Sequence, residues 1–228
     1  MITLLNDSKE DKWTPLSIDT IRNAISLPMN YSIEKNIAYN IQYLQFISKQ
    51  LNELRLTSVL KKMLYKTYII TGMAVLEAIF YCALKEKGYL AKESWKTEKK
   101  YISNEIGPDD NRTRIVSEVQ KKYEPEEVRQ NLDSLINKVK SKKIFSTKII
   151  TSDLLENYRE LRNKIHIYIC NDTSESDYNS FKEIDYVVMK VILKKFIYDD
   201  VVTKKDKRKD LDIIFGNAEN ELDELLKG

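Results

Sequence analysis

The spacing of apolar and polar residues along the chain is mostly that of α-helices. Between residues 32 and 54, apolar side chains recur every three or four positions, which places them on one face of an amphipathic helix. A second helix is predicted from about Thr57 to Lys87, because Gly88 follows it as a helix-ending residue. Its middle, residues 69–84, is apolar on nearly all sides, which is typical of a central helix covered by its neighbours.

Four more helices are expected further along the chain. Pro125 is suited to open the first of them, and Ser152 to cap the second. The segment before them, residues 88–124, has a weaker pattern, with short helices expected on either side of a turn cluster at 107–111 and without sustained strand-like alternation. The four predicted helices cover about 125–140, 152–171, 175–198 and 210–226.

The first thirty residues have a mixed pattern that Pro15 and Pro28 interrupt. We expect an extended N-terminal arm over residues 1–30, with one short helix around 17–26 that Ser17 could cap.

These patterns predict an all-α fold, a helical bundle with extra helices and an N-terminal arm. Only five glycines and four prolines occur in 228 residues, and turn-dense β folds need more of both. The rest of the chain, residues 31–228, is expected to form a single helical domain, in which 88–145 is a candidate insertion.

Composition narrows the functional classes. The net charge is only +3, from 38 basic and 35 acidic residues, so any nucleic-acid binding must rest on local patches. The chain has no phosphate-binding glycine loop, dinucleotide fingerprint or zinc-ligand spacing, so neither a cofactor nor a metal is expected. Cys82 and Cys170 lie in apolar runs, where buried free thiols in a reducing compartment are expected.

The location is expected to be cytoplasmic, without a membrane anchor. The first ten residues lack the basic and apolar regions of a signal peptide. The one long apolar run, residues 68–84, contains Glu77 and is short for a membrane span.

The single histidine, His166, marks the most informative segment. Arg159 and Arg162 precede it at helical spacing, with Asn163 between them and the histidine. If the segment is one helix, these four side chains share a face that lies away from the apolar face. The apolar face is formed by Leu154, Tyr158, Leu161, Ile165 and Tyr168.

This set of side chains suits cleavage of RNA without a metal. A histidine near neutral pKa can take the proton of a ribose 2′-hydroxyl or return one to the leaving oxygen. An arginine can hold the phosphate and stabilise the charge that develops on it. Asn163 could orient either partner. The alternative is a polar stripe on a solvated helix face, without catalysis.

The segment from Leu161 to His166 resembles the signature of HEPN-domain proteins, which are all-α domains of prokaryotic toxins and phage-defence ribonucleases. Their motif is an Arg, often followed by a polar residue such as Asn, with four to six residues between that Arg and a His. Arg159 has six residues before His166, whereas the more typical Arg162-Asn163 pair has three, so both arginines are candidates. The segment 75–79 (Val-Leu-Glu-Ala-Ile) resembles the buried helix on which the family packs its motif helix.

The resemblance implies a homodimer in which two motif helices form a composite Arg/His site. It also implies a metal-independent endoribonuclease that leaves a 2′,3′-cyclic phosphate, acting as a toxin or in phage defence. An antitoxin or another defence-system protein is then the expected partner besides RNA. The alternative is a non-catalytic HEPN-like module that binds or assembles such a complex.

Several charged residues are candidates for supporting roles. Glu77 lies in an apolar run and could pair with Arg159 or Arg162 and hold it, or pair elsewhere. Basic side chains near the motif could steer an RNA backbone, or could be solvated charges on a loop. The basic candidates are Lys142, Lys143, Lys148 and Lys164.

A second basic segment precedes the turn cluster. Lys96, Lys99 and Lys100 lie beside Trp95 and Tyr101, a combination that offers charge and stacking to a nucleic acid.

Overall fold

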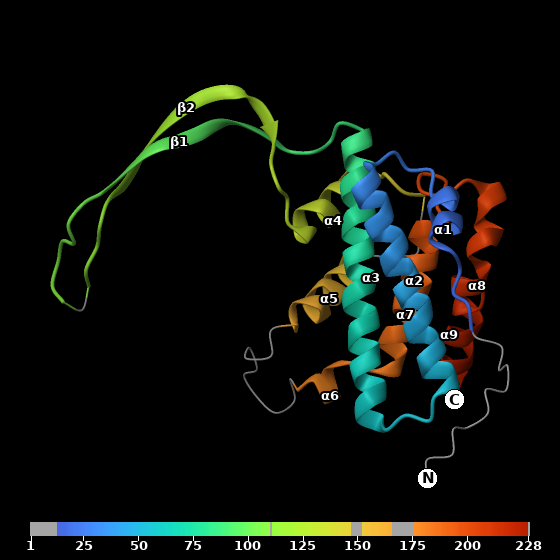
Figure 1. Ribbon diagram of the computed structural model, residues 1–228. Helices are drawn as coiled ribbons and strands as arrows, with labels where there is room; N and C mark the ends of the chain where they lie inside the picture. The colour runs from blue at the N-terminus through green and yellow to red at the C-terminus, as the bar shows by residue number, and fades with distance from the viewer. Residues whose placement is uncertain (1–12, 110, 147–151, 166–175, 228) are drawn as a thin grey trace, which may run out of the picture.

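The computed structural model describes residues 13–109, 111–146, 152–165 and 176–227, which form a helical body with one long β-hairpin (Figure 1). The helical part of the predicted fold class is confirmed, and the hairpin is the exception to it. The first four helices are α1 (Ile18–Ala24), α2 (Tyr31–Glu53), α3 (Ser58–Glu86) and α4 (Leu132–Ser141). They are followed by α5 (Ser152–Asn163), α6 (Asp177–Ser180), α7 (Glu183–Ile197), the 3-10 helix η2 (Lys205–Leu211), α8 (Asp212–Phe215) and α9 (Ala218–Lys227). The strands are β1 (Lys92–Ile102) and β2 (Val116–Glu127).

Helix α3 is the centre of the body, with α2, α4, α5 and α7 packed around it. It begins where Thr57 accepts a hydrogen bond from the backbone N–H of Leu60, and it ends before Gly88, whose φ of 70° suits a helix-ending residue. Tyr68, Leu76 and Phe80 are fully buried on it. The prediction of a covered central helix is therefore confirmed.

Among the described helices, α3 is also long and apolar enough to cross a membrane by length and composition. Most of its apolar stretch is buried inside the body, a property that it shares with the core helices of soluble proteins.

The described part of the predicted N-terminal arm packs on the body. Ser17 caps α1 by accepting a hydrogen bond from the N–H of Thr20 at 3.1 Å, as expected. Ile21 and Ala24 are fully buried in the core. The Ser26 N–H donates to the Val202 carbonyl at 2.7 Å, which ties this segment to the C-terminal part of the chain.

The hairpin replaces helices that we expected, and this part of the prediction was wrong. Strands β1 and β2 pair antiparallel over residues 92–127, and nearly all their side chains are exposed on both faces. Because neither face is buried, the strands lack the alternation of apolar and polar residues that marks a half-buried strand. Pro125 lies in a register shift of β2 rather than at a helix start, and α4 begins at Leu132, capped by Asn131.

Three of the predicted helices also differ from the helices in the structure. Helix α5 ends at Asn163, and Lys164 and Ile165 form a turn, so the expected continuation of that helix towards residue 171 is wrong at this point. The helix expected over 175–198 is divided: α6 ends at Ser180, and α7 begins at Glu183 after the fully buried Phe181. The helix expected over 210–226 is divided near Gly216 into α8 and α9, with η2 before them.

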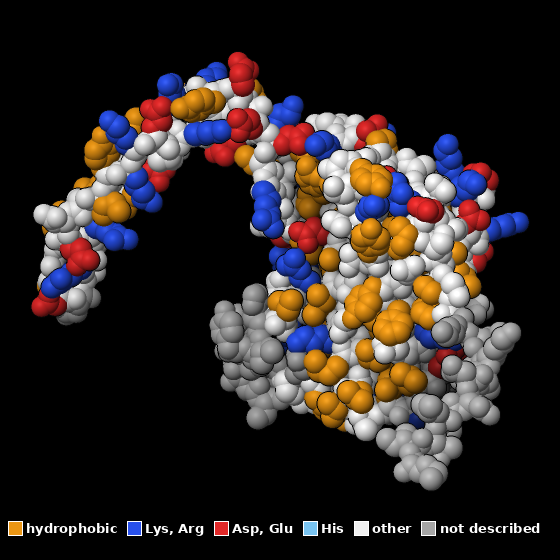
Figure 2. Space-filling view, viewed as in Figure 1, with side chains coloured by type: hydrophobic (Ala, Val, Ile, Leu, Met, Phe, Trp, Pro, Cys, Tyr) orange, Lys and Arg blue, Asp and Glu red, His pale blue; other side chains and the backbone are white. Residues whose placement is uncertain are grey.

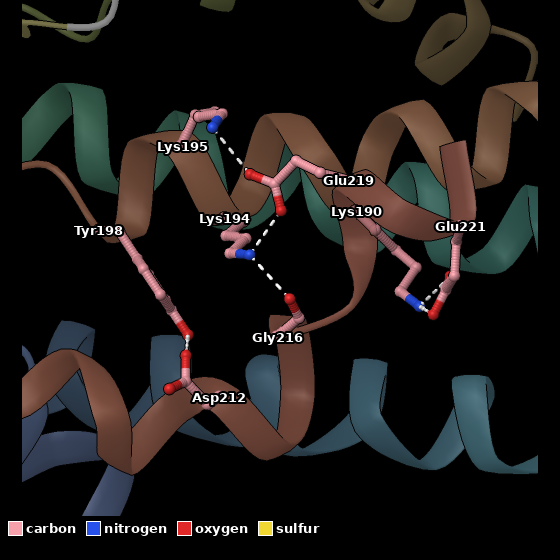
Figure 3. A network of polar contacts seen from close by, with 8 residues as sticks. All are labelled: Lys190, Lys194, Lys195, Tyr198, Asp212, Gly216, Glu219 and Glu221. Carbon is pink, nitrogen blue, oxygen red and sulfur yellow. Dashed lines mark hydrogen bonds and ion pairs between the residues drawn. The ribbon is translucent and has the colours of Figure 1, made fainter. Parts of the chain in front are cut away.

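The C-terminal helices are held to α7 by a network of polar contacts (Figure 3). Lys194 donates to the Gly216 carbonyl at 2.9 Å, and it forms an ion pair with Glu219. The Tyr198 hydroxyl donates to Asp212 at 2.9 Å. The remaining ion pairs of the network join Lys195 to Glu219 and Lys190 to Glu221.

Candidate functional site

Helix α5 is fixed on the body by its apolar face. Leu155 and Tyr158 are buried, and the Tyr158 hydroxyl donates to the backbone carbonyl of Asp185 at 2.7 Å. Burial, together with the nearby Asp185, raises the pKa of Tyr158, so the hydroxyl remains a donor at neutral pH. Arg159 and Arg162 follow Leu155 and Tyr158 by four residues each, so they lie beside this buried face and reach α4 and α3.

Arg162 forms an ion pair with Glu77 of the central helix. Its Nη2 lies 3.2 Å from Oε2 of Glu77, and the two side chains are 40% and 29% exposed. Of the alternatives left open for Glu77, the structure shows the pairing with Arg162. A guanidinium has five N–H donors, so this contact leaves donors of Arg162 that can reach a second anion.

Arg159 forms a different contact. Its Nη1 donates to Oδ1 of Asp133, in the first turn of α4, at 2.8 Å. Its Nε is buried without a hydrogen-bond partner in the structure. Arg159 therefore joins α5 to α4, and less of its side chain is exposed than of Arg162.

The remaining members of the predicted site are only partly placed. Asn163 is exposed at the end of α5, and Lys164 Nζ donates to the Ser180 hydroxyl at 3.0 Å. His166 and Lys148 lie outside the described residues, so their position relative to the arginines stays a prediction.

The structure does not bring Lys142 and Lys143, two of the predicted basic residues, to the arginines. Lys142 and Lys143 follow the last turn of α4, whereas Arg159 contacts Asp133 in its first turn. A helix rises about 1.5 Å per residue, so nine residues separate these points by about 14 Å along the axis. Lys142 lies over the Tyr89 ring instead, at 5.1 Å from its centroid.

A cavity of about 570 Å³ opens beside the Glu77–Arg162 pair. Glu77 lines it together with Tyr81 of α3, and the segment between β2 and α4 forms the facing wall. In that segment, both amide atoms of Gln130 are buried without a hydrogen-bond partner in the structure. Sequence reasoning missed Gln130, because a glutamine between two elements carries no periodic or spacing signal. The lining also includes Ile33, Ala74, Ala78, Arg129 and Leu135.

The described residues include no group of three or more His, Cys, Asp or Glu side chains that could hold a metal ion. Cys82 is buried, and burial raises the pKa of its thiol to about 11, so it is a poor nucleophile at neutral pH. Cys170 lies outside the described residues.

Two smaller cavities, of about 300 and 380 Å³, lie along the network of Figure 3 and include neither arginine.

Comparison with protein-family models, with curated proteins and with solved structures found no match to this chain. The interpretation of the site therefore rests on the residues and contacts above.

Proposed function

We propose that the protein is a metal-independent endoribonuclease with a HEPN-like helical fold. The observation that carries the proposal is the contact of Arg162 with Glu77, which holds a partly exposed guanidinium beside a cavity on the central helix. A guanidinium that is fixed by one carboxylate and still has free donors is suited to bind a phosphate bidentately.

The proposed reaction is an internal transesterification. The ribose 2′-oxygen attacks the neighbouring phosphorus while His166 accepts the 2′-hydroxyl proton. The bond from phosphorus to the 5′-oxygen breaks, and that oxygen takes up a proton as it leaves. The products are a 2′,3′-cyclic phosphate and a 5′-hydroxyl end. Arg162 binds the phosphate and stabilises its added charge, and Asn163 supports it.

Arg159 takes a positioning role in this proposal. It links α5 to α4 through Asp133 and is more covered than Arg162. The composite site contains α5 from each of two copies, and toxin activity or phage defence in the cytoplasm is the proposed setting. An antitoxin or another defence protein would then restrain the enzyme.

The proposal is tested with purified full-length protein and end-labelled single-stranded RNA in the presence of EDTA. We expect cleavage with 2′,3′-cyclic phosphate ends, reduced at least about 100-fold in His166→Ala and in Arg162→Ala, as is common when an acid–base or charge-stabilising group is removed. Arg55→Ala is the matched control, because Arg55 is exposed between α2 and α3, and it should cleave like the wild type.

Two results of this assay would contradict the proposal. If the wild type leaves all RNA intact, or if the three variants cleave equally, the ribonuclease assignment is wrong. A non-catalytic binding or assembly module then becomes the better explanation of the arginine pairs. Growth of cells that express the wild type or His166→Ala gives a second measure, since a toxin should slow growth only in its active form.

A further inference from the structure

The β1–β2 hairpin, residues 92–127, is called the hairpin arm below, and it stands apart from the helical body (Figure 1). None of its described residues belongs to the hydrophobic core. The described contacts with the body lie at its root, where Glu127 forms an ion pair with Lys85 at 3.4 Å. The Val128 N–H donates to the Ala91 carbonyl just below the strands. The arm is therefore held by its base alone in the single chain.

Such an arm is poorly stabilised when only water surrounds it. A two-stranded hairpin without further packing is marginally stable at best, and both of its edges carry unpaired backbone groups. The arm also exposes large apolar side chains, most of them at least 45% accessible. Exposed apolar surface of this extent is typical of an interaction site. The largest examples are Trp95, Tyr101, Ile102, Ile115, Val116 and Val119.

The arm has a defined direction. It leaves the C-terminal end of α3 and arches over the side of the body on which α4 and α5 lie (Figure 1). The space-filling view shows an open hollow between the arm and that side (Figure 2). A partner in the hollow would contact the inner side of the arm and the side of the body that carries Arg159 and Arg162.

The exposed area is large enough for a stable interface. Strands β1 and β2 contain 11 and 12 residues, and all but one of their side chains are exposed. A standard interface takes about 20 to 30 residues from each partner.

The charges of the arm favour a protein over a nucleic acid. Residues 92–127 contain eight basic and nine acidic side chains, so the arm has no net attraction for phosphates. Its lysines also face carboxylates across the strands, as Lys96 does with Glu126 at 2.6 Å and Lys100 with Glu118 at 3.5 Å. The exposed aromatic side chains are of a type that is enriched at protein interfaces, and the balanced charges around them give no net repulsion of a second protein.

We infer that the hairpin arm packs against a second copy of this chain, which lies in the hollow beside α4 and α5. A two-fold axis relates the two copies, so that each arm packs against the other copy. Such an axis covers both arms at once and closes the assembly. The inference rests on the proposed function in one respect, that two α5 helices come together in this hollow.

Light scattering of the full-length protein after size-exclusion chromatography tests this inference. We expect a dimer for the wild type and monomers for the double variant Trp95→Lys, Tyr101→Lys, because these two side chains lie on opposite faces of the arm and whichever face meets the partner then carries an ammonium group. Ile213→Lys is the matched control, since this side chain is 70% exposed on α8, away from the arm, and it should remain dimeric. Circular dichroism should show an unchanged helical signal in both variants. A monomeric wild type, or a dimer that the arm substitutions leave intact, would overturn the inference.

A photo-cross-linking amino acid at Tyr101 identifies the occupant directly. We expect a product of twice the chain mass, joined between the arm and the helical body of the other copy. If irradiation with added single-stranded RNA gives RNA adducts and no doubled mass, the occupant is RNA and the inference fails. The cleavage assay is independent of both measurements. A dimer that does not cleave RNA contradicts the proposed function alone. A protein that cleaves RNA as a dimer, and stays a dimer after the arm substitutions, contradicts the arm inference alone.

Discussion

Arg162 of α5 donates a hydrogen bond to Glu77 of α3 at 3.2 Å, a contact between residues 85 positions apart in the chain. Neither partner is fully buried, so water still solvates both charges. The contact nevertheless fixes the guanidinium that we propose for phosphate binding, because Glu77 projects from α3, the central helix around which the others pack. Its strength can be measured separately from any activity.

A double-mutant cycle with Glu77→Gln and Arg162→Gln should give a coupling free energy of about 0.5–1 kcal/mol, since partly exposed ion pairs are weakened by solvent. Urea unfolding of the four proteins measures it. The pair Lys96 and Glu126 on the hairpin arm is more exposed, and its cycle should give a coupling close to zero. Additive effects of Glu77→Gln and Arg162→Gln would show that the contact does not hold in solution.

The parts of the fold that the sequence predicted correctly are those in which one face of an element is buried. Helices α2 and α3 were located to within a few residues, because their apolar spacing and their ends agree: Thr57 caps α3 and Gly88 follows it. The same reasoning failed for the hairpin arm. An arm that is exposed on both faces has no apolar period, and the charged residues of its strands are equally common on helices.

The candidate site, like the fold, could be predicted only in part from the sequence. The pairing of Glu77 with one of two arginines was one of two alternatives left open by the sequence, because an unpaired carboxylate in an apolar run is costly but could also pair elsewhere. The choice of Arg162 depends on how α5 is rotated against α3, which the spacing along one helix does not determine. The end of α5 at Asn163 was missed because the apolar spacing continues beyond it. His166, the residue that drew attention to the segment, lies outside the described residues.

Tyr158→Phe should destabilise the protein by about 1 kcal/mol, because it removes the buried hydrogen bond to the Asp185 carbonyl that fixes α5 against α7. Chemical denaturation measures the change. Tyr39→Phe removes the same hydroxyl from a side chain that is 49% exposed, and it should have almost no effect. Equal stability of the two variants would mean that the Tyr158 hydroxyl does not anchor α5.

Glu221→Ala should destabilise the protein more than Lys190→Met. The Lys190 side chain is only 5% exposed, and its Nζ lies 2.7 Å from Oε1 of Glu221, so removal of the carboxylate leaves a largely buried ammonium without its counter-ion. We expect a loss of about 1–3 kcal/mol for Glu221→Ala, at the lower end because Glu221 is itself partly exposed, and a smaller loss for the uncharged Met. Glu53→Ala, in the surface pair with Lys49, is the control and should cost under about 0.5 kcal/mol. The reverse order of the first two variants would contradict this account.

The folded state should become less stable as the pH falls, partly because Glu219 becomes protonated. Partial burial opposes ionisation of this carboxyl, but the hydrogen bonds from Lys194 and Lys195 outweigh it and lower the pKa. A carboxyl whose pKa is lower in the folded state stabilises the protein above its unfolded pKa of about 4.3, and this contribution disappears as the pH falls towards the folded value. Thermal unfolding between pH 7 and pH 3 should therefore show a smaller decline for Glu219→Gln than for the wild type. A parallel decline of both proteins would exclude this contribution.

Gly72→Ala should destabilise the protein by about 1–2 kcal/mol, even though alanine favours a helix more than glycine does. A Cβ at this position would lie 2.9 Å from Met189 Sδ and 3.1 Å from Leu193 Cδ1, so Gly72 sets how closely α3 approaches α7. Adding Met189→Ala should then cost less in the Gly72→Ala background than in the wild type, because the new methyl group occupies part of the vacated space. Gly88→Ala is the control. Its φ of 70° strains an alanine, but no atom lies within 4 Å of the added Cβ, so its cost should simply add to that of Met189→Ala. Purely additive effects of Gly72→Ala and Met189→Ala would show that α3 and α7 do not meet at Gly72.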